Sequence, residues 1–113
     1  MRPVTAVSPS DLALAKEFVR RLAEQVDPRV FHVTLCGSRA RGDADEESDL
    51  DLFVALNGDD PGGQIKAAAR LIACDLTLEH GLLVSVFVAE KTFFDQHRDF
   101  ALLKTIEEEG VPI

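Results

Sequence analysis

A glycine-bounded turn between two apolar stretches constrains the fold of this chain more than any other feature. The turn is the hexapeptide GSRARG at positions 37–42, and it follows a run of β-forming residues at 30–36. A second apolar run at 50–56 begins just after Asp49 and contains Asp51. Because side chains alternate along a strand, Asp49 and Asp51 are expected to point to the same face of a sheet. The sequence therefore predicts a polar site where the turn meets the second strand.

Periodicity and turn residues predict the other elements. The expected elements are a helix from a Ser8–Asp11 capping box to Val26, strands at 30–36, 50–56 and 82–88, a helix at 64–80 closed by Gly81, and a helix at 91–109 broken near 97–99. The strand at 82–88 is the most apolar, which predicts a central or doubly covered position. This order predicts an α+β fold, with a small mixed sheet of about three or four strands and helices packed on one face. Residues 1–113 are expected to form one domain, since this length is near the commonest domain size.

The charge balance narrows the classes of function. The chain has 12 Lys and Arg residues against 20 Asp and Glu residues, giving a formal net charge of −8. Nucleic-acid-binding domains usually carry a basic patch, so this balance disfavours a nucleic-acid substrate, although a nucleotide neutralised by metal still fits. No apolar run approaches the roughly 20 residues of a membrane span, and the first residues lack the apolar core of a secretory signal. We therefore expect a cytoplasmic protein with no membrane partner.

The two cysteines and three histidines do not show the spacing of a metal site. Cys36 ends an apolar strand and Cys74 lies in a helical pattern, so both are expected to be small buried hydrophobic residues in a reducing compartment. His32, His80 and His97 are expected at the surface or at helix ends.

The glycine turn has the chemistry of a phosphate site. Gly37 allows a sharp bend and the close approach of a ligand. If Ser38 begins a short helix, its amide and hydroxyl would face a phosphate, and Arg39 or Arg41 would neutralise charge. A Walker A loop is excluded, because Asp43 stands where that loop requires lysine.

Asp49 and Asp51 have the chemistry of a divalent-cation site. Two carboxylates this close repel each other unless a cation lies between them, and oxygen ligands suit Mg²⁺ or Mn²⁺. The loop from Asp43 is not an EF-hand, because its sixth position is Ser48 rather than glycine. An isolated pair of this kind at a strand end is more often a solvated turn. The metal interpretation therefore depends on the neighbouring glycine turn.

Together, GSRARG and the SDLDL segment that begins at Ser48 resemble the active-site motif of the minimal nucleotidyltransferase family, within the DNA polymerase beta superfamily. The predicted order of elements is similar to the compact core of that family over nearly the whole chain. The resemblance implies transfer of a nucleoside monophosphate to an acceptor hydroxyl, with ATP as the expected donor. It implies that Gly37 and Ser38 hold the triphosphate, and that Asp49 and Asp51 bind two Mg²⁺ ions that stabilise the attacking and leaving oxygens.

One position departs from the pattern of that family. The family usually adds a third carboxylate from the next core strand, where this chain has Ser85. Asp75, Glu79 or Glu90 would have to substitute, and each lies outside the centre of that strand. Nucleotide binding is therefore the firmer expectation, because loss of a positioned general base typically lowers a rate about 10²–10⁴-fold.

Two functions remain open. The first is a Mg²⁺-dependent enzyme whose acceptor comes from a partner protein, because the chain has little beyond the catalytic core. The second is a nucleotide-binding antitoxin or regulatory module without turnover. For either, the resemblance implies a HEPN-type helical partner in a toxin–antitoxin system, and the sequence leaves open whether the chain also forms a homo-oligomer. A purely structural domain would require the whole motif to be accidental.

Overall fold

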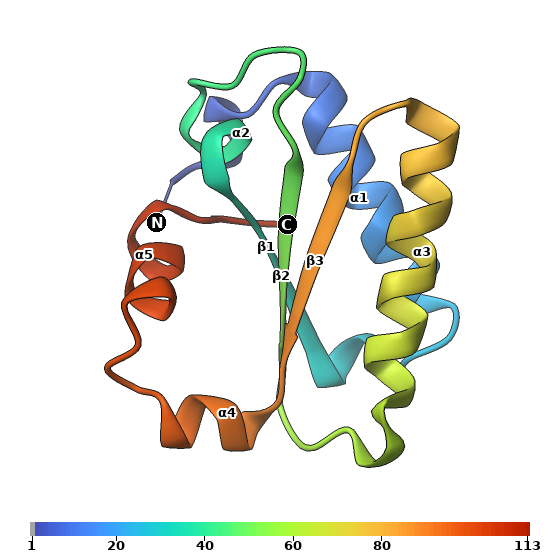
Figure 1. Cartoon of the computed structure of the whole chain (residues 1–113), viewed down its shortest axis with the longest axis vertical. Coiled ribbons are helices and arrows are strands. Elements are labelled where there is room, and N and C mark those ends of the chain that lie inside the picture. Colours follow the sequence, from blue (N-terminus) through green and yellow to red (C-terminus); the bar gives the residue numbers. More distant parts are fainter. Residues whose placement is uncertain (1) are drawn as a thin grey trace.

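The computed structural model describes residues 2–113 and contains the predicted helices and strands in the predicted order (Figure 1). Within that range the α-helices and strands are α1 (Pro9–Ala23), β1 (Phe31–Cys36), α2 (Gly37–Arg41), β2 (Leu50–Leu56), α3 (Gln64–His80), β3 (Val84–Ala89), α4 (Lys91–Gln96), α5 (Ala101–Glu109) and β4 (Val111–Pro112). Single 3-10 turns cover Val4–Ala6, Pro28–Val30 and Pro61–Gly63. The predicted break near 97–99 is confirmed as the gap between α4 and α5. α1 ends before Val26, because the residues that follow Ala23 form a turn.

The four strands form one mixed sheet in the order β3-β2-β1-β4. β1 is antiparallel to β2, with Leu35 opposite Leu52, and β2 is parallel to β3. α3 supplies the crossover that a parallel pair requires. β4 is antiparallel to β1, and its two residues are too few to show strand periodicity in the sequence. The predicted fold class, a mixed sheet with helices packed on it, is confirmed.

The sequence predicts a central or doubly covered position for this strand, and β3 lies at an edge of the sheet, so only the second alternative fits. The apolar composition of this segment has another cause, because β3 packs against α3 on one side and against aromatic side chains on the other. Val84 is only 4% exposed, whereas Leu83 and Phe87 keep 52% and 41% of their surface. An apolar run indicates cover above and below a strand, and it does not show whether the strand has a neighbour on each side.

The hydrophobic core lies between the sheet and helices α1 and α3, and we call this side of the sheet the packed face (Figure 1). Alternate residues of β1 and β2 point to it and are buried, as the strand pattern predicts. Phe18 and Leu22 of α1 and Leu76 of α3 are fully buried against them. At the start of α3, the carboxylate of Asp60 accepts hydrogen bonds from the backbone amides of Ile65 and Lys66, at 2.9 and 3.0 Å.

α4 and α5 lie on the other side of the sheet, which we call the open face (Figure 1). Phe53 of β2 points to this side and contacts Phe94 of α4 edge-on, with ring centroids 5.8 Å apart. α1 and α3 pack on one face as predicted, whereas the helix predicted at 91–109 forms α4 and α5 on the opposite face. Asp51 and Phe53 share the open face, because side chains two residues apart in a strand point the same way.

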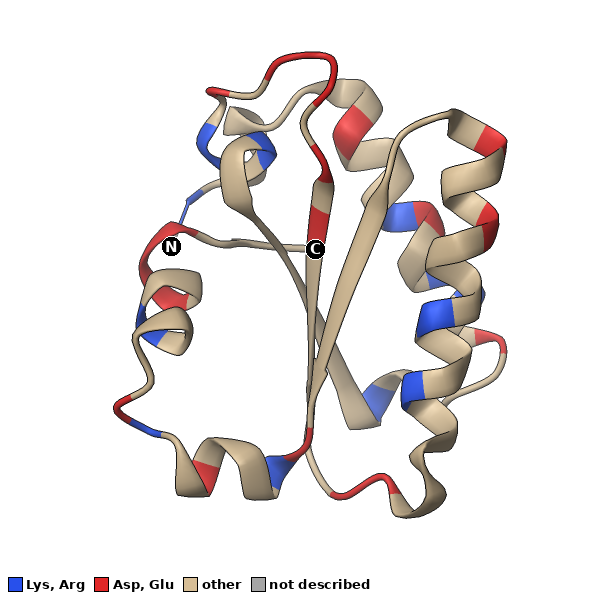
Figure 2. Cartoon of the chain, viewed as in Figure 1, with Lys and Arg blue, Asp and Glu red and all other residues tan. Residues whose placement is uncertain are grey.

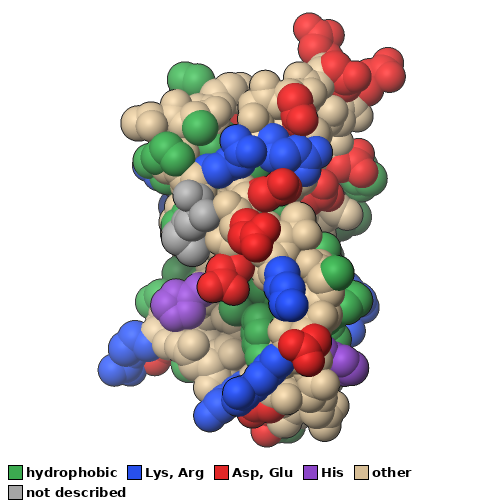
Figure 3. Space-filling view, turned by 90° about the vertical axis from the view of Figure 1, so that its left-hand side faces the viewer, with side chains coloured by type: hydrophobic (Ala, Val, Ile, Leu, Met, Phe, Trp, Pro, Cys, Tyr) green, Lys and Arg blue, Asp and Glu red, His purple; other side chains and the backbone are tan. Residues whose placement is uncertain are grey.

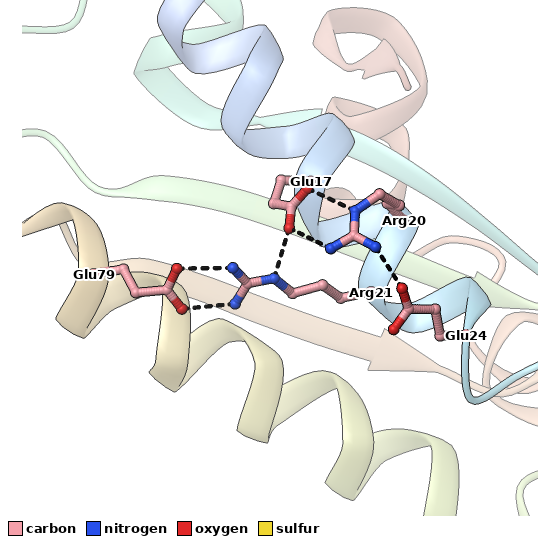
Figure 4. Close-up of polar contacts among 5 residues, drawn as sticks. All are labelled: Glu17, Arg20, Arg21, Glu24 and Glu79. Atoms are coloured by element: carbon pink, nitrogen blue, oxygen red, sulfur yellow. Dashed lines mark hydrogen bonds and ion pairs between the residues drawn. The ribbon is translucent and has the colours of Figure 1, made fainter.

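An ion-pair network joins α1 to α3 at the border of the packed face (Figure 4). Arg21 donates through Nη1 and Nη2 to Glu79, and through Nε to Glu17, each at 2.7 Å. Arg20 also binds Glu17 and pairs with Glu24. Hydrogen bonds from Arg20 and Arg21 lower the pKa of Glu17 to about 2. The network therefore keeps Glu79 in an ion pair on the packed-face side of the molecule.

Acidic and basic residues are interspersed along the helices, and acidic residues predominate in the loop before β2 (Figure 2). On the side drawn in Figure 3, basic side chains lie directly beside acidic ones. That side therefore offers the phosphates of a nucleic acid mixed charge rather than an extended basic surface. Of the two cysteines, Cys36 is partly buried and Cys74 is exposed, so the prediction of a buried Cys74 is wrong. Across residues 2–113, no helix combines the length and apolar character needed to cross a bilayer.

Candidate functional site

The junction of β1 and α2 brings Gly37 against the carboxylate of Asp51. Gly37 has φ of +74°, a conformation that residues with side chains rarely adopt. A Cβ atom at this position would lie 2.5 Å from Oδ2 of Asp51. Glycine is therefore needed both for the backbone turn and for the space that the carboxylate occupies. The turn and the aspartate face each other, as the motif requires.

Asp49 and Asp51 are close enough for their charges to interact. Asp51 is partly buried in β2, opposite Cys36 of β1 and Ser85 of β3, whereas Asp49 precedes the strand and is exposed. Burial raises the pKa of Asp51, and the negative charge of Asp49 raises it further. Burial, with the charge of Asp51, also raises the pKa of the Cys36 thiol to about 12, so this cysteine is not a thiolate at neutral pH.

Ser38 is the second residue of α2 and is partly exposed beside Gly37. Buried Ala40 anchors this short helix, and Gly42 closes it in the left-handed conformation at φ +79°. The two glycines of the motif thus bound one short helix. The structure brings Gly37, Ser38 and Asp51 together at one end of the sheet, and their roles toward a ligand stay predictions.

Arg39 is a structural brace and is not free to bind phosphate as the sequence suggests. Its Nη1 donates to Oδ1 of Asp11 at 2.9 Å, and the two side chains are only 11% and 10% exposed. Its Nε donates to the carbonyl of Ser48 at 2.8 Å, and Nη2 donates to the carbonyls of Asp45 and Glu46 at 3.3 Å each. The guanidinium therefore ties the start of α1 to the acidic loop that leads into Asp49. This loop is the red segment at the top of Figure 2.

This brace changes the interpretation of the first helix terminus. The Ser8 hydroxyl accepts a hydrogen bond from the amide of Asp11 at 3.2 Å, which confirms the predicted N-cap. The Asp11 carboxylate binds Arg39 instead of completing the capping box. Sequence reasoning missed this partner, because the two residues are 28 positions apart and no local pattern connects them.

Arg41 is the arginine of the motif that stays accessible. It pairs with Asp43 at 3.3 Å and with Glu109 of α5 at 3.5 Å, and its side chain is 35% exposed. The hydrogen bond to Asp43 is the main cause of a raised pKa for Arg41. Both distances are long for ion pairs, so the guanidinium can exchange these partners for a phosphate more readily than Arg39 can.

Ser85 lies opposite Asp51 in the sheet, and its equivalence to the third carboxylate of the resembled family stays a prediction. Asp75 and Glu79 lie on α3, which covers the packed face, and Glu90 follows the far end of β3. None of the three therefore replaces Ser85 beside Asp51. Among residues 2–113, no cluster of three or more His, Cys, Asp or Glu side chains is placed to hold a metal.

The donor set nevertheless fits a hard cation. Asp49 and Asp51 supply two carboxylates whose mutual repulsion a cation would relieve. Mg²⁺ commonly binds through one or two carboxylates and completes its shell with waters and substrate phosphates. A cation site here would therefore depend on a phosphorylated ligand for the rest of its ligands.

Comparison with known proteins covers most of the chain. Residues 15–112 match the family model described as a nucleotidyltransferase domain. Two Methanocaldococcus jannaschii proteins named as candidate protein adenylyltransferases, MJ0604 and MJ0141, are similar to this chain. MJ0604 is 29% identical over 96 residues, which cover 84% of this chain and 89% of the relative. MJ0141 is 30% identical over 95 residues, which cover 80% of this chain and 95% of the relative.

Proposed function

The chain belongs to the nucleotidyltransferase domain family, and from that membership we propose that it transfers AMP from ATP to a hydroxyl group on a partner protein in a Mg²⁺-dependent reaction. Family membership supports nucleotidyl transfer as the general chemistry. The names of the two relatives support an adenylyl group as the transferred unit and a protein as the acceptor.

The contact between Gly37 and Asp51, with Asp49 beside it, is the observation that carries this proposal. A nucleoside triphosphate needs a backbone that it can approach closely and a carboxylate pair that can share a cation with its phosphates. When bound, Mg²⁺ would neutralise phosphate charge and polarise the phosphoryl group. Asp49 and Asp51 would hold the cation.

The remaining residues of the motif have separate tasks in this proposal. Because Gly37 has no side chain, the Asp51 carboxylate and a cation that it holds can lie against the turn. The Ser38 hydroxyl donates a hydrogen bond to the phosphates. Arg41 adds positive charge at the border of the site. Arg39 does not contact the nucleotide and instead positions the loop that carries Asp49.

Ser85 limits how the acceptor hydroxyl can be activated in this proposal. A serine opposite Asp51 does not act as a carboxylate base, so the acceptor hydroxyl must reach the site already well oriented or with its own base. A HEPN-type helical protein is the partner that the family resemblance implies, and pairing with a second copy of this chain is a further arrangement to test.

A second function, nucleotide binding without turnover, is also favoured by Ser85. A regulatory or antitoxin module would keep the triphosphate site and lose the third carboxylate. The substitution Ser85→Asp separates the two functions. If the missing carboxylate limits the rate, this variant transfers AMP faster than the natural chain.

The direct test uses ATP labelled on the α- or the γ-phosphate, with Mg²⁺, in the presence and absence of the protein encoded beside this one in the genome. If AMP is transferred, the neighbouring protein should acquire label from ATP labelled on the α-phosphate and no label from ATP labelled on the γ-phosphate. Asp49→Asn and Asp51→Asn should each lower transfer by about 100-fold or more, because the cation contributes several kcal/mol to the transition state.

Asp59→Asn is the matched control, since Asp59 is an exposed aspartate in the loop after β2. It should leave transfer unchanged. Label from the γ-phosphate would mean a kinase-like reaction and would reject the proposal. Tight binding of ATP·Mg²⁺ with no transfer, in both the natural chain and Ser85→Asp, would instead support the binding module.

A further inference from the structure

We propose that a hollow on the open face of the sheet binds the purine ring of the nucleotide donor by stacking. This inference rests on the proposed function, since it assigns one part of the same nucleotide to a second set of residues. The hollow is a cavity of about 180 Å³. Its residues come from β1, α2, β2, β3 and α5, so only the folded chain forms it.

The cavity has one polar end and apolar walls. Gly37 and Asp51 form its polar end, and they belong to the candidate phosphate and cation site. Phe53 and Phe87 line its aromatic side, and Leu102 and Ile106 of α5 complete the walls. A nucleotide has the same polarity, with charged phosphates at one end and a flat apolar ring at the other. The polar end of the cavity is therefore part of the phosphate site, whereas its apolar walls offer a different chemistry.

The strand register sets the separation between the two parts. Asp51 pairs with Ser85, and two residues further along the strands Phe53 pairs with Phe87. Two residues of a β-strand span about 7 Å. A ribose bridges a gap of this scale between the α-phosphate and the base. A triphosphate held at Asp51 therefore brings its ring to the level of the two phenylalanines.

The aromatic side is prepared for a flat ligand. The rings of Phe53 and Phe87 are nearly parallel, with centroids 5.5 Å apart and an interplanar angle of 13°. Phe53 is 4% exposed, whereas Phe87 is 41% exposed and Leu102 is 42% exposed. Exposed apolar side chains grouped at a concave site are typical of ligand binding rather than of folding alone.

The size of the cavity favours a ring over a protein segment. Its volume of about 180 Å³ is small for a folded protein segment. A second cavity of about 320 Å³ shares Phe53 and Ile106 with it. Stacking reads the face of the ring and not its hydrogen-bonding edge. We therefore assign this hollow to the purine ring of the donor without distinguishing adenine from guanine.

The test compares two ligands that share the triphosphate and differ in the ring. Calorimetry measures the Kd of ATP and of inorganic tripolyphosphate, each with Mg²⁺, for the natural chain and for Phe87→Ala. Loss of one stacked aromatic contact typically weakens nucleotide binding about 5- to 150-fold. We expect a weakening in this range for ATP and no change for tripolyphosphate.

Phe100→Ala is the matched control. Phe100 is 45% exposed and belongs to the same group of aromatic rings through its contact with Phe93, but it does not line the cavity beside Asp51. This variant should bind both ligands as the natural chain does. Leu102→Ala, on the opposite wall, should weaken the binding of ATP and leave the binding of tripolyphosphate unchanged. It serves as a second variant if Phe87→Ala folds poorly.

A direct optical measurement is available because the chain has no Trp and no Tyr. The triphosphate of 2-aminopurine riboside is fluorescent, and stacking quenches its emission. Titration of the natural chain should quench the probe, and Phe87→Ala should quench it less at saturation.

The outcomes separate the two proposals. The ring site is overturned if Phe87→Ala weakens the binding of ATP and of tripolyphosphate equally, or if it weakens the binding of neither. If Asp51→Asn still weakens tripolyphosphate in that case, the proposed function stands. If the natural chain binds neither ligand, both proposals fail. Unchanged ATP binding with slower AMP transfer would assign the hollow to the acceptor and also overturns the ring site.

Discussion

The two faces of the sheet are built from the same strands and differ in how completely they are covered. On the packed face, Phe18, Leu22 and Leu76 are 0% exposed. On the open face, Phe87 and Phe100 keep 41% and 45% of their surface, and two cavities remain beneath α4 and α5. One face therefore supplies most of the stability and the other supplies room for a ligand. The alternation of side chains along each strand lets one backbone serve both purposes.

Charge is also placed differently on the two sides. Near the packed face, the carboxylate of Glu17 lies among arginines, and its pKa falls to about 2 (Figure 4). On the open face, Asp51 is partly buried beside Asp49, and its pKa rises. The first arrangement favours the ionised carboxylate and so supports the fold. The second disfavours it, as is common at functional sites.

The largest expected effect comes from truncating the same residue type on each face. Phe18→Ala should lower the free energy of unfolding by about 3–5 kcal/mol, because it leaves a cavity in a fully buried core. Phe87→Ala should lower it by less than half as much, since that ring is 41% exposed. Urea unfolding followed by far-UV circular dichroism measures both. Equal losses would mean that the two faces are packed alike, contrary to the comparison above.

The two arginines of the motif give the next largest difference. Arg39→Ala should cost about 3 kcal/mol, because it leaves the buried Asp11 carboxylate without its partner. Arg41→Ala should change stability much less, since Arg41 makes only long contacts at the surface. Thermal unfolding gives the comparison. Arg39→Lys should not restore stability, because an ammonium group cannot make the same fixed set of bonds.

Hydrogen exchange gives a second measurement of the brace. The amides of residues 45–48 should exchange faster in Arg39→Ala than in Arg41→Ala, because Arg39 holds the carbonyls of this loop. Unchanged exchange in both variants would show that the loop is held by other contacts, and it would remove the positioning role assigned to Arg39.

The parts of the fold that the sequence predicts are those that depend on local signals. α3 follows from its helical spacing, and Gly81 closes it in the left-handed conformation that glycine favours. β2 follows from its alternation, which also puts Asp51 on the face opposite the core. The approach of Gly37 to Asp51 follows from the antiparallel pairing of β1 and β2, which puts Cys36 opposite Asp51.

The parts that the sequence does not predict depend on contacts between distant segments. β3 lies at the edge because no other strand pairs with its free side, and its apolar residues would be equally suitable for a central strand. The partner of Arg39 depends on how α2 is rotated against α1. The ring pair of Phe53 and Phe87 requires the parallel register of β2 and β3, which no single segment encodes.

A smaller effect of opposite sign is expected from Asp51→Asn in the absence of metal. The raised pKa means that the folded state binds the Asp51 proton more tightly than the unfolded state does. The ionised carboxylate therefore lowers stability at neutral pH. The difference in stability between the natural chain and Asp51→Asn should disappear below the ordinary Asp pKa. Asp51→Asn should be more stable than the natural chain at pH 7, by less than about 1 kcal/mol at this partly exposed site.

Added Mg²⁺ should reverse that order. A ligand that binds only the folded state stabilises it, so Mg²⁺ with ATP should raise the Tm of the natural chain more than that of Asp51→Asn. A variant that is less stable than the natural chain at pH 7 without metal would mean that the carboxylate already has a stabilising partner, and the contrast in charge between the two faces would be lost.

The smallest effect is expected from Glu17→Gln, at the border of the packed face. The lowered pKa means that ionised Glu17 adds stability above its ordinary pKa of 4.5, and that this contribution is lost as the pH falls toward about 2. Glu17→Gln should therefore melt slightly below the natural chain at pH 7, and the gap should narrow between pH 4.5 and 3. Added salt should also narrow it, because the arginines are near solvent. Glu47→Gln, in the exposed loop before β2, is the control and should show no such dependence. If the difference in Tm between the natural chain and Glu17→Gln instead grew as the pH fell, ionised Glu17 would not be the stabilising form. The contrast in charge between the two faces would then be lost.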